Sequence, residues 1–223
     1  MKFFLRDYDE EDSTELRVDF MGEGMNILKT FSSKEKSPEK GIKLDEGFHT
    51  LRWGGDVEGF ELPEGVMAPR GSSGYVESFS VVPGKYSVKF SFGDYEKISE
   101  FHIFPDPRNE VDGSHFSKKA DLMQGIHDDI DDIYNSLRKM QSVRTQLGDL
   151  KSRLSDEDHS DILDLSKETV ELIDETELKL ISPKQKTFQD VINFRNQLDS
   201  QFLDLLSKVD GNVPPVTSGE LTR

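Results

Sequence analysis

The chain changes from one apolar pattern to another at Asp106, Pro107 and Arg108. Before this point glycine and phenylalanine are concentrated, since 12 of the 17 Gly and 11 of the 15 Phe lie within residues 1–104. After it, acidic stretches repeat apolar residues at helical spacing. A change of apolar period from 2 to about 3.5 is typical of two architectures joined end to end. We therefore expect a multi-domain α+β chain.

Short alternating segments dominate the first part of the chain. Residues 16–20 and 86–92 alternate apolar and polar side chains, which is typical of half-buried strands. Turns are expected at Pro83-Gly84 and Gly93-Asp94. About six or seven such strands predict an antiparallel Ig-like β-sandwich over residues 1–105. A Gly- and Pro-rich irregular insertion interrupts it at residues 54–74.

The second part predicts an antiparallel three-helix bundle over residues 117–211, after a linker at 106–116 and before a tail at 212–223. Ser117 is the expected N-cap, and Asp210-Gly211 is the expected end. Arg144 interrupts the first apolar stripe, and we expect it to extend its charge outward. The three stripes are Leu122, Ile126, Ile130, Ile133, Leu137, Met140 and Leu147; then Ile162, Leu165, Thr169, Leu172, Ile173 and Leu180; then Val191, Phe194, Leu198, Phe202, Leu205, Leu206 and Val209.

Charge and composition exclude several classes of function. The formal net charge is -16, which opposes binding to nucleic acid, because that requires clustered Lys and Arg. The absence of cysteine removes disulfides, thiolate catalysis and cysteine-ligated zinc. No apolar run is long enough for insertion into a membrane, and residues 1–7 do not have the pattern of a signal peptide.

The order of short motifs resembles a known module. GFHTLRWGG at residues 47–55 precedes VPGKYSV at residues 82–88. This order resembles the immunoglobulin-like module of flagellar hook-capping proteins and of many bacterial secreted proteins, although Gly54 stands where that module usually has Asp. With IFPDPR at residues 103–108 and the helices that follow, nearly the whole chain resembles the C-terminal region of bacterial sortilin-like β-propeller proteins. These are often labelled glycosyl hydrolases because of their BNR-type repeats.

This resemblance implies a non-catalytic structural or protein-interaction region of a larger exported protein. The expected location is periplasmic or extracellular, as part of a precursor. The expected partner is the chain's own upstream propeller domain or another protein. No propeller repeat occurs in the chain, so any activity of the propeller cannot be carried over. In the family another helix follows, and its absence would leave a groove for a partner helix or a second copy. The oligomeric state stays open.

The alternative function is a carbohydrate-binding accessory module of a glycoside hydrolase. Such modules present exposed aromatic rings to sugars, and Trp53 with Phe60 or Tyr75 is the candidate platform. The competing interpretation is a core Trp packed between two sheets. Under either interpretation, the sequence shows no set of residues typical of a catalytic site. The five histidines lack the spacing of a metal site, and no acidic residue stands at the end of a strand in a fold with an obvious cleft.

No cofactor is expected, apart from a weak calcium candidate in an N-terminal acidic loop. Its residues lack the Gly and distal Glu of an EF-hand loop, so a polar turn is the competing interpretation. The acidic run at residues 128–132 is expected to form a solvated helix face. The loop carboxylates are those of Asp7, Asp9, Glu10, Glu11 and Asp12.

The residues at the change of pattern are expected to form a structural junction. Pro107 restricts Asp106 to extended backbone. Arg108 is expected to anchor the contact between the domains through hydrogen bonds to backbone or carboxylate groups.

Overall fold

The computed structural model of the chain is mixed α/β with antiparallel sheets. It describes residues 1–223 except 7–12, 68–74, 77, 155–158, 188 and 223. The chain forms two compact units, which are considered separately below. Unit 1 comprises Met1–Glu58 with Glu77–Ala120, and unit 2 comprises Gly59–Val76 with Asp121–Arg223.

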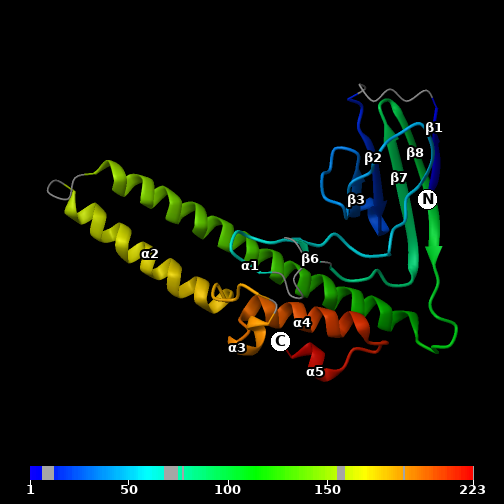
Figure 1. Cartoon of the computed structure of the whole chain (residues 1–223). Helices are drawn as coiled ribbons and strands as arrows, with labels where there is room; N and C mark the ends of the chain where they lie inside the picture. Colours follow the sequence, from blue (N-terminus) through cyan, green and yellow to red (C-terminus); the bar gives the residue numbers. More distant parts are fainter. Residues whose placement is uncertain (7–12, 68–74, 77, 155–158, 188, 223) are drawn as a thin grey trace. The chain divides into compact units, whose positions relative to one another are not determined.

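Unit 1 contains a four-stranded and a two-stranded antiparallel sheet (Figure 1). The strand orders are β3-β2-β7-β8 and β1-β4. A single 3-10 turn, Glu23–Met25, joins β2 to β3. The strands are β1 Lys2–Leu5, β2 Leu16–Met21, β3 Ile27–Ser32, β4 Gly47–Thr50, β7 Gly84–Phe92 and β8 Tyr95–Ile103.

The alternating pattern of β2 explains the core of unit 1. Leu16, Val18 and Phe20 lie on one face of this central strand and are buried. They belong to one apolar cluster, to which β1 adds Leu5 and, half-buried, Phe3. Because β1 belongs to the other sheet, the two sheets share this core. β2 and β7 confirm the strands predicted at residues 16–20 and 86–92.

The two predicted turns differ in the structure. Gly93 connects β7 to β8 with φ of 56°, a left-handed conformation that favours glycine. Gly84, in contrast, is already the first residue of β7, opposite Ile103 of β8. Pro83 therefore precedes the strand directly.

Residues 59–76, which overlap most of the insertion predicted at residues 54–74, belong to unit 2. Two short strands, β5 Phe60–Glu61 and β6 Tyr75–Val76, pair there as an antiparallel ladder. The Phe60 ring is 1% exposed and lies 4.5 Å from the His127 ring. Arg138 donates to the Glu61 carbonyl, and Gln141 Nε2 donates to the Glu64 carbonyl at 2.8 Å. The loop is thus fixed to the first long helix.

Five helices follow β8, and two of their predicted bounds are wrong. The first begins before Ser117, because Asp112 Oδ1 accepts a hydrogen bond from Ser114 N at 2.8 Å and so takes the capping position. The third predicted helix is divided, since residues 194–197 lie between two helices. The bounds are α1 Gly113–Arg153, α2 Ser160–Leu180, α3 Asp190–Asn193, α4 Leu198–Gly211 and α5 Ser218–Leu221.

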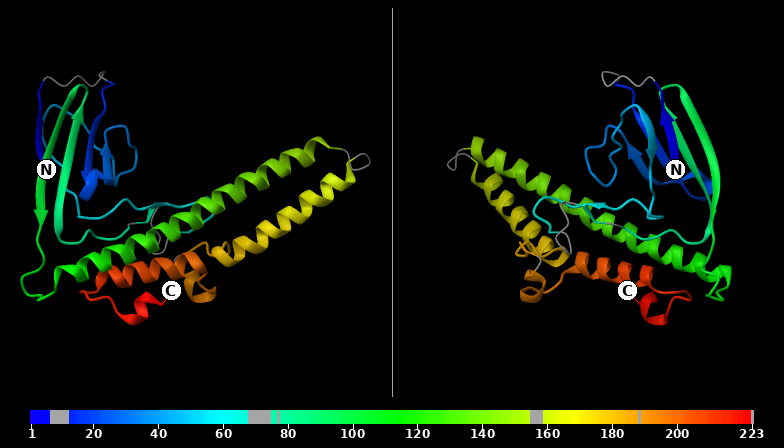
Figure 2. Two further views of the ribbon diagram at one scale, coloured as in Figure 1. Left: turned by 180° about the vertical axis from the view of Figure 1, so that it is seen from behind. Right: turned by 45° about the vertical axis from the view of Figure 1, so that its right-hand side comes forward.

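The first predicted stripe is largely confirmed, and α4 runs beside this part of α1 in all views (Figures 1 and 2). Met123, Tyr134 and, on α4, Leu203 are also buried, although the stripes omit them. The predicted outward orientation of Arg144 is wrong. Its guanidinium donates to Asp174 Oδ1 at 2.7 Å and to the Glu177 carboxylate, which connects α1 to α2. The buried stripe residues on α1 are Leu122, Ile126, Ile130, Ile133 and Leu137.

The predicted stripe of α2 is mostly not a buried face. Ile173 is buried, whereas Ile162, Leu165 and Leu172 are exposed. The inward face of α2 contains Ile173 and Glu177 and is rotated relative to the predicted stripe. Glu177 forms an ion pair with Arg144. Most of the predicted apolar stripe of α2 is therefore exposed to solvent.

We expect Phe60→Ala to destabilise unit 2 by about 3–5 kcal/mol, because it empties a fully buried ring site. The matched variant Phe48→Ala removes a ring that is 87% exposed and should change the free energy of unfolding by less than about 1 kcal/mol. Chemical denaturation followed by circular dichroism measures both. Equal effects would contradict the docking of Phe60, Glu61 and Glu64 on α1.

Candidate interaction surfaces

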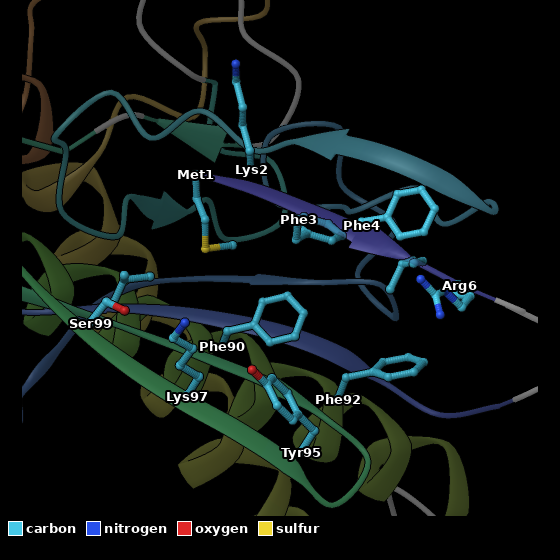
Figure 3. Close-up of a pocket in the computed structure, with 12 residues that line it drawn as sticks. Met1, Lys2, Phe3, Phe4, Arg6, Phe90, Phe92, Tyr95, Lys97 and Ser99 are labelled. Carbon is cyan, nitrogen blue, oxygen red and sulfur yellow. The ribbon is translucent and has the colours of Figure 1, made fainter.

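Unit 1 contains an open groove of about 500 Å³ between β1 and the β7–β8 hairpin (Figure 3). Its aromatic lining comes from both sheets. The Phe3 ring lies 5.4 Å from the Phe90 ring, which in turn lies 6.1 Å from the Tyr95 ring. Phe92 and Lys97 also line the groove. A cavity of this size with aromatic walls suits the side chains of a ligand.

The groove exists because the two sheets differ in width. Tyr95, Lys97 and Ser99 share one face of β8 with Phe101, which packs against the core. The first three are nevertheless exposed, since the two-stranded sheet covers less than the four-stranded sheet. A polar Lys and Ser on the inward face of a strand are a sequence signal for this opening. The opening of the groove was not predicted from the sequence.

The charge of the groove is opposite to that of the chain. Three of its twelve lining residues, Lys2, Arg6 and Lys97, are cationic, and none of the twelve is acidic. The chain as a whole has a formal net charge of -16. The groove is therefore a local positive site on an acidic protein.

The predicted aromatic platform is divided between the two units. Trp53 belongs to unit 1, where it stacks on Phe20 at 4.3 Å and donates from Nε1 to the Asp56 carbonyl at 2.8 Å. Phe60 belongs to unit 2 and is buried, so it offers no exposed ring, in contrast to its role in the predicted platform. The side chain of Tyr75 lies outside what the structure describes.

The junction residues form a local turn. Arg108 Nε donates to Asp106 Oδ1 at 2.9 Å and to Oδ2 at 3.0 Å, and the Arg108 backbone nitrogen donates to Oδ1 at 2.9 Å. These bonds lower the pKa of Asp106. Both side chains bracket Pro107, so the carboxylate that meets Arg108 is that of its near neighbour. The predicted anchoring of the domain contact stays a prediction.

The described residues contain no group of three or more His, Cys, Asp or Glu side chains that could hold a metal ion. The calcium candidate from Asp7 to Asp12 lies outside the described residues. Within the described ranges, no helix combines the length and the apolarity needed to cross a bilayer.

A buried acid lies in the core of unit 2. Asp199, in the first turn of α4, is 5% exposed, and burial raises its pKa to about 6 although Ser200 donates to it. Burial also raises the pKa of Tyr134, and the charge of Asp199 adds to this shift. The Tyr134 hydroxyl has no hydrogen-bond partner among the described residues. These groups lie within packed helices and line no cavity described here.

No protein-family model, no curated protein and no solved structure gives a significant match to the chain.

We expect Asp199→Asn to increase the free energy of unfolding by an amount that depends on pH. A carboxyl whose folded pKa lies above its unfolded value is harder to ionise in the folded state, so stability falls as pH rises from about 4 to above 6. The gain from Asn should approach zero near pH 3.5 and reach about 3 kcal/mol above pH 7. Denaturation at several pH values measures it. A flat difference for Asp199→Asn over this pH range would contradict the burial of its carboxyl group.

Proposed function

We propose that the chain is a non-catalytic structural and protein-interaction region of a larger exported β-propeller protein. In this proposal unit 1 is an Ig-like β-sandwich, and the helices of unit 2 act as a three-helix bundle. The region contacts its own upstream propeller domain or another protein, in the periplasm or outside the cell. The sequence resemblance supports the propeller part of the proposal, and an exposed helix face supports the interaction part.

The observation that carries the interaction function is the outer face of α2. Ile162, Leu165 and Leu172 are 45%, 64% and 65% exposed. Leu165 and Leu172, seven residues apart, lie on one face, and Ile162 borders this face at the start of α2, as on a helix that packs against another helix. Large aliphatic side chains gathered on one face are typical of an interaction surface. We name Ile162, Leu165 and Leu172 the α2 stripe.

Charge beside the α2 stripe defines the kind of partner. On the side away from Ile173, α2 carries five carboxylates, and Lys179 lies in its last turn. A basic amphipathic helix would place apolar residues on the stripe and its cations against these acids. A second copy of the same helix would bring like charges together. The carboxylates are those of Asp161, Asp164, Glu168, Glu171 and Glu175.

We expect the double variant Leu165→Ser/Leu172→Ser to lose binding of a basic amphipathic helix. Burying each leucine in a complex is worth about 1.5–3 kcal/mol, so affinity should fall more than tenfold. Calorimetric titration with a synthetic helix of Leu and Lys measures this. Because both leucines are exposed, the thermal unfolding of the variant should stay close to that of the native chain.

The matched control is Leu178→Ser, a leucine that is 49% exposed on the opposite side of α2. It should bind the basic helix as the native chain does. Equal affinity of the double variant and this control would contradict the α2 stripe. Saturable binding of a soluble glycan with a change in Trp53 fluorescence would instead favour the carbohydrate-binding alternative.

The propeller part of the proposal has its own test. We expect the reading frame upstream of Met1 to encode β-propeller blades, because the resemblance covers only the region that follows them. Sequencing of the genomic locus checks this. An independent promoter directly before Met1 would weigh against it.

A further inference from the structure

We propose that the free edge of β1 binds an extended acidic segment of a partner protein as an added strand. The segment would carry an apolar residue at every second position and would lie over the groove described above. This site is in unit 1 and is independent of the α2 stripe. Three observations carry the proposal: the edge geometry of β1, the uncovered face of β8 and the charge of the groove.

Hydrogen bonding identifies which backbone groups of β1 are committed to β4. The Met1 nitrogen donates to the Leu51 carbonyl at 2.7 Å, and the Leu51 nitrogen donates to the Met1 carbonyl at 3.0 Å. Antiparallel strands alternate such pairs with pairs that exchange no bonds. Phe3, opposite His49, is therefore directed toward β4, like Met1.

The backbone groups of the residues that alternate with Met1 and Phe3 point away from β4. The N–H and C=O groups of Lys2 and Phe4 are directed to the edge of β1 that faces away from β4. Among the described residues, β4 is the one strand that pairs with β1. This edge is a template for an extended chain, and the two residues offer donors and acceptors at the repeat of a strand.

An added strand would cover the part of the four-stranded sheet that β1 and β4 leave open. Tyr95, Lys97 and Ser99 face inward from β8, and Tyr95 is 57% exposed. Figure 3 shows Tyr95 and Lys97 beneath β1, with Phe90 between them and Phe3. Alternate side chains of the added strand would enter the groove of about 500 Å³. The apolar residues of the segment would contact Phe90 and Tyr95.

The cationic side chains around the groove indicate which kind of segment would bind there. The lining contributes Lys2, Arg6 and Lys97 and no carboxylate, whereas the chain has a net charge of -16. Lys2 lies on the face of β1 opposite to Phe3 and points away from Phe90 and Tyr95 (Figure 3), so Glu or Asp between the apolar residues of an added strand would lie on the same side as its ammonium group. A second copy of the chain would bring two strongly acidic molecules together, which opposes self-association at this edge.

The test uses a short peptide that alternates Val with Glu, titrated into the full chain. Phe4→Pro removes the outward N–H, and Pro is tolerated on an edge strand whose N–H faces solvent. Phe4→Ala, the matched control, removes the same exposed ring and keeps the N–H. We expect Phe4→Ala to bind within about threefold of the native chain and Phe4→Pro to bind at least tenfold more weakly.

Two further arms keep the proposal testable if Phe4→Pro does not fold. N-methylation of alternate peptide residues should abolish binding in one of the two possible patterns and preserve it in the other, because only one set of N–H groups faces β1. Lys2→Glu, on the outward face of β1, should weaken the acidic peptide by about two- to fivefold and should strengthen binding of a Val-Lys peptide. Thermal unfolding checks that each variant is folded.

The proposal is overturned by any of four results. These are no binding of the Val-Glu peptide at millimolar concentration, equal binding by folded Phe4→Pro and Phe4→Ala, equal effects of both methylation patterns, and concentration-dependent dimerisation that the peptide does not displace. None of these results affects helix binding by the α2 stripe, so the two proposals fail separately.

Discussion

A sheet with one apolar face has to be covered, and in unit 1 the cover is narrower than the sheet. The four strands β3, β2, β7 and β8 bury Leu16, Val18 and Phe20 at their centre. Only β1 and β4 supply the opposite layer, with Leu5 in the shared core. The side chains at the centre of the sheet are therefore buried, whereas Tyr95 at its margin stays exposed. The groove, its aromatic lining and the open edge of β1 all follow from this mismatch.

Unit 2 has a similar shortage of covering surface along its helices. The part of α1 from Leu122 to Leu137 is packed by α4 and by the Phe60 loop, so Met123, Ile130 and Leu137 are fully buried. Beyond this region Arg144 connects α1 to α2 through two carboxylates. An ion pair fixes the position of a helix without burying an apolar face, so the leucines of α2 stay in water. A low hydrophobic content of 34% limits how much surface the chain can cover by itself.

Much of the local structure could be predicted from the sequence. The alternation in β2 and β7 and the helical spacing of Leu122 to Leu137 identified strands and a helix, because period is a property of neighbouring residues. The predicted cap at Ser117 was wrong, because Asp112 meets the same capping requirement five residues closer to the change of pattern. The third helix was predicted as continuous because its apolar spacing runs through residues 194–197. Those residues instead have extended backbone at Phe194, where α3 ends.

The sequence by itself determined the elements, the acidic charge and the absence of cysteine chemistry, since these depend on residue type and on short-range spacing. Only the tertiary structure decided which apolar residues are covered. Phe60 and Leu172 are both apolar residues on regular elements, yet one is buried by His127 and Tyr134 and the other faces water. The same holds for the basic groove, which Arg6 and Lys97 both line although they lie about ninety residues apart in the sequence. Burial and the meeting of distant charges depend on long-range packing, which short-range spacing does not encode.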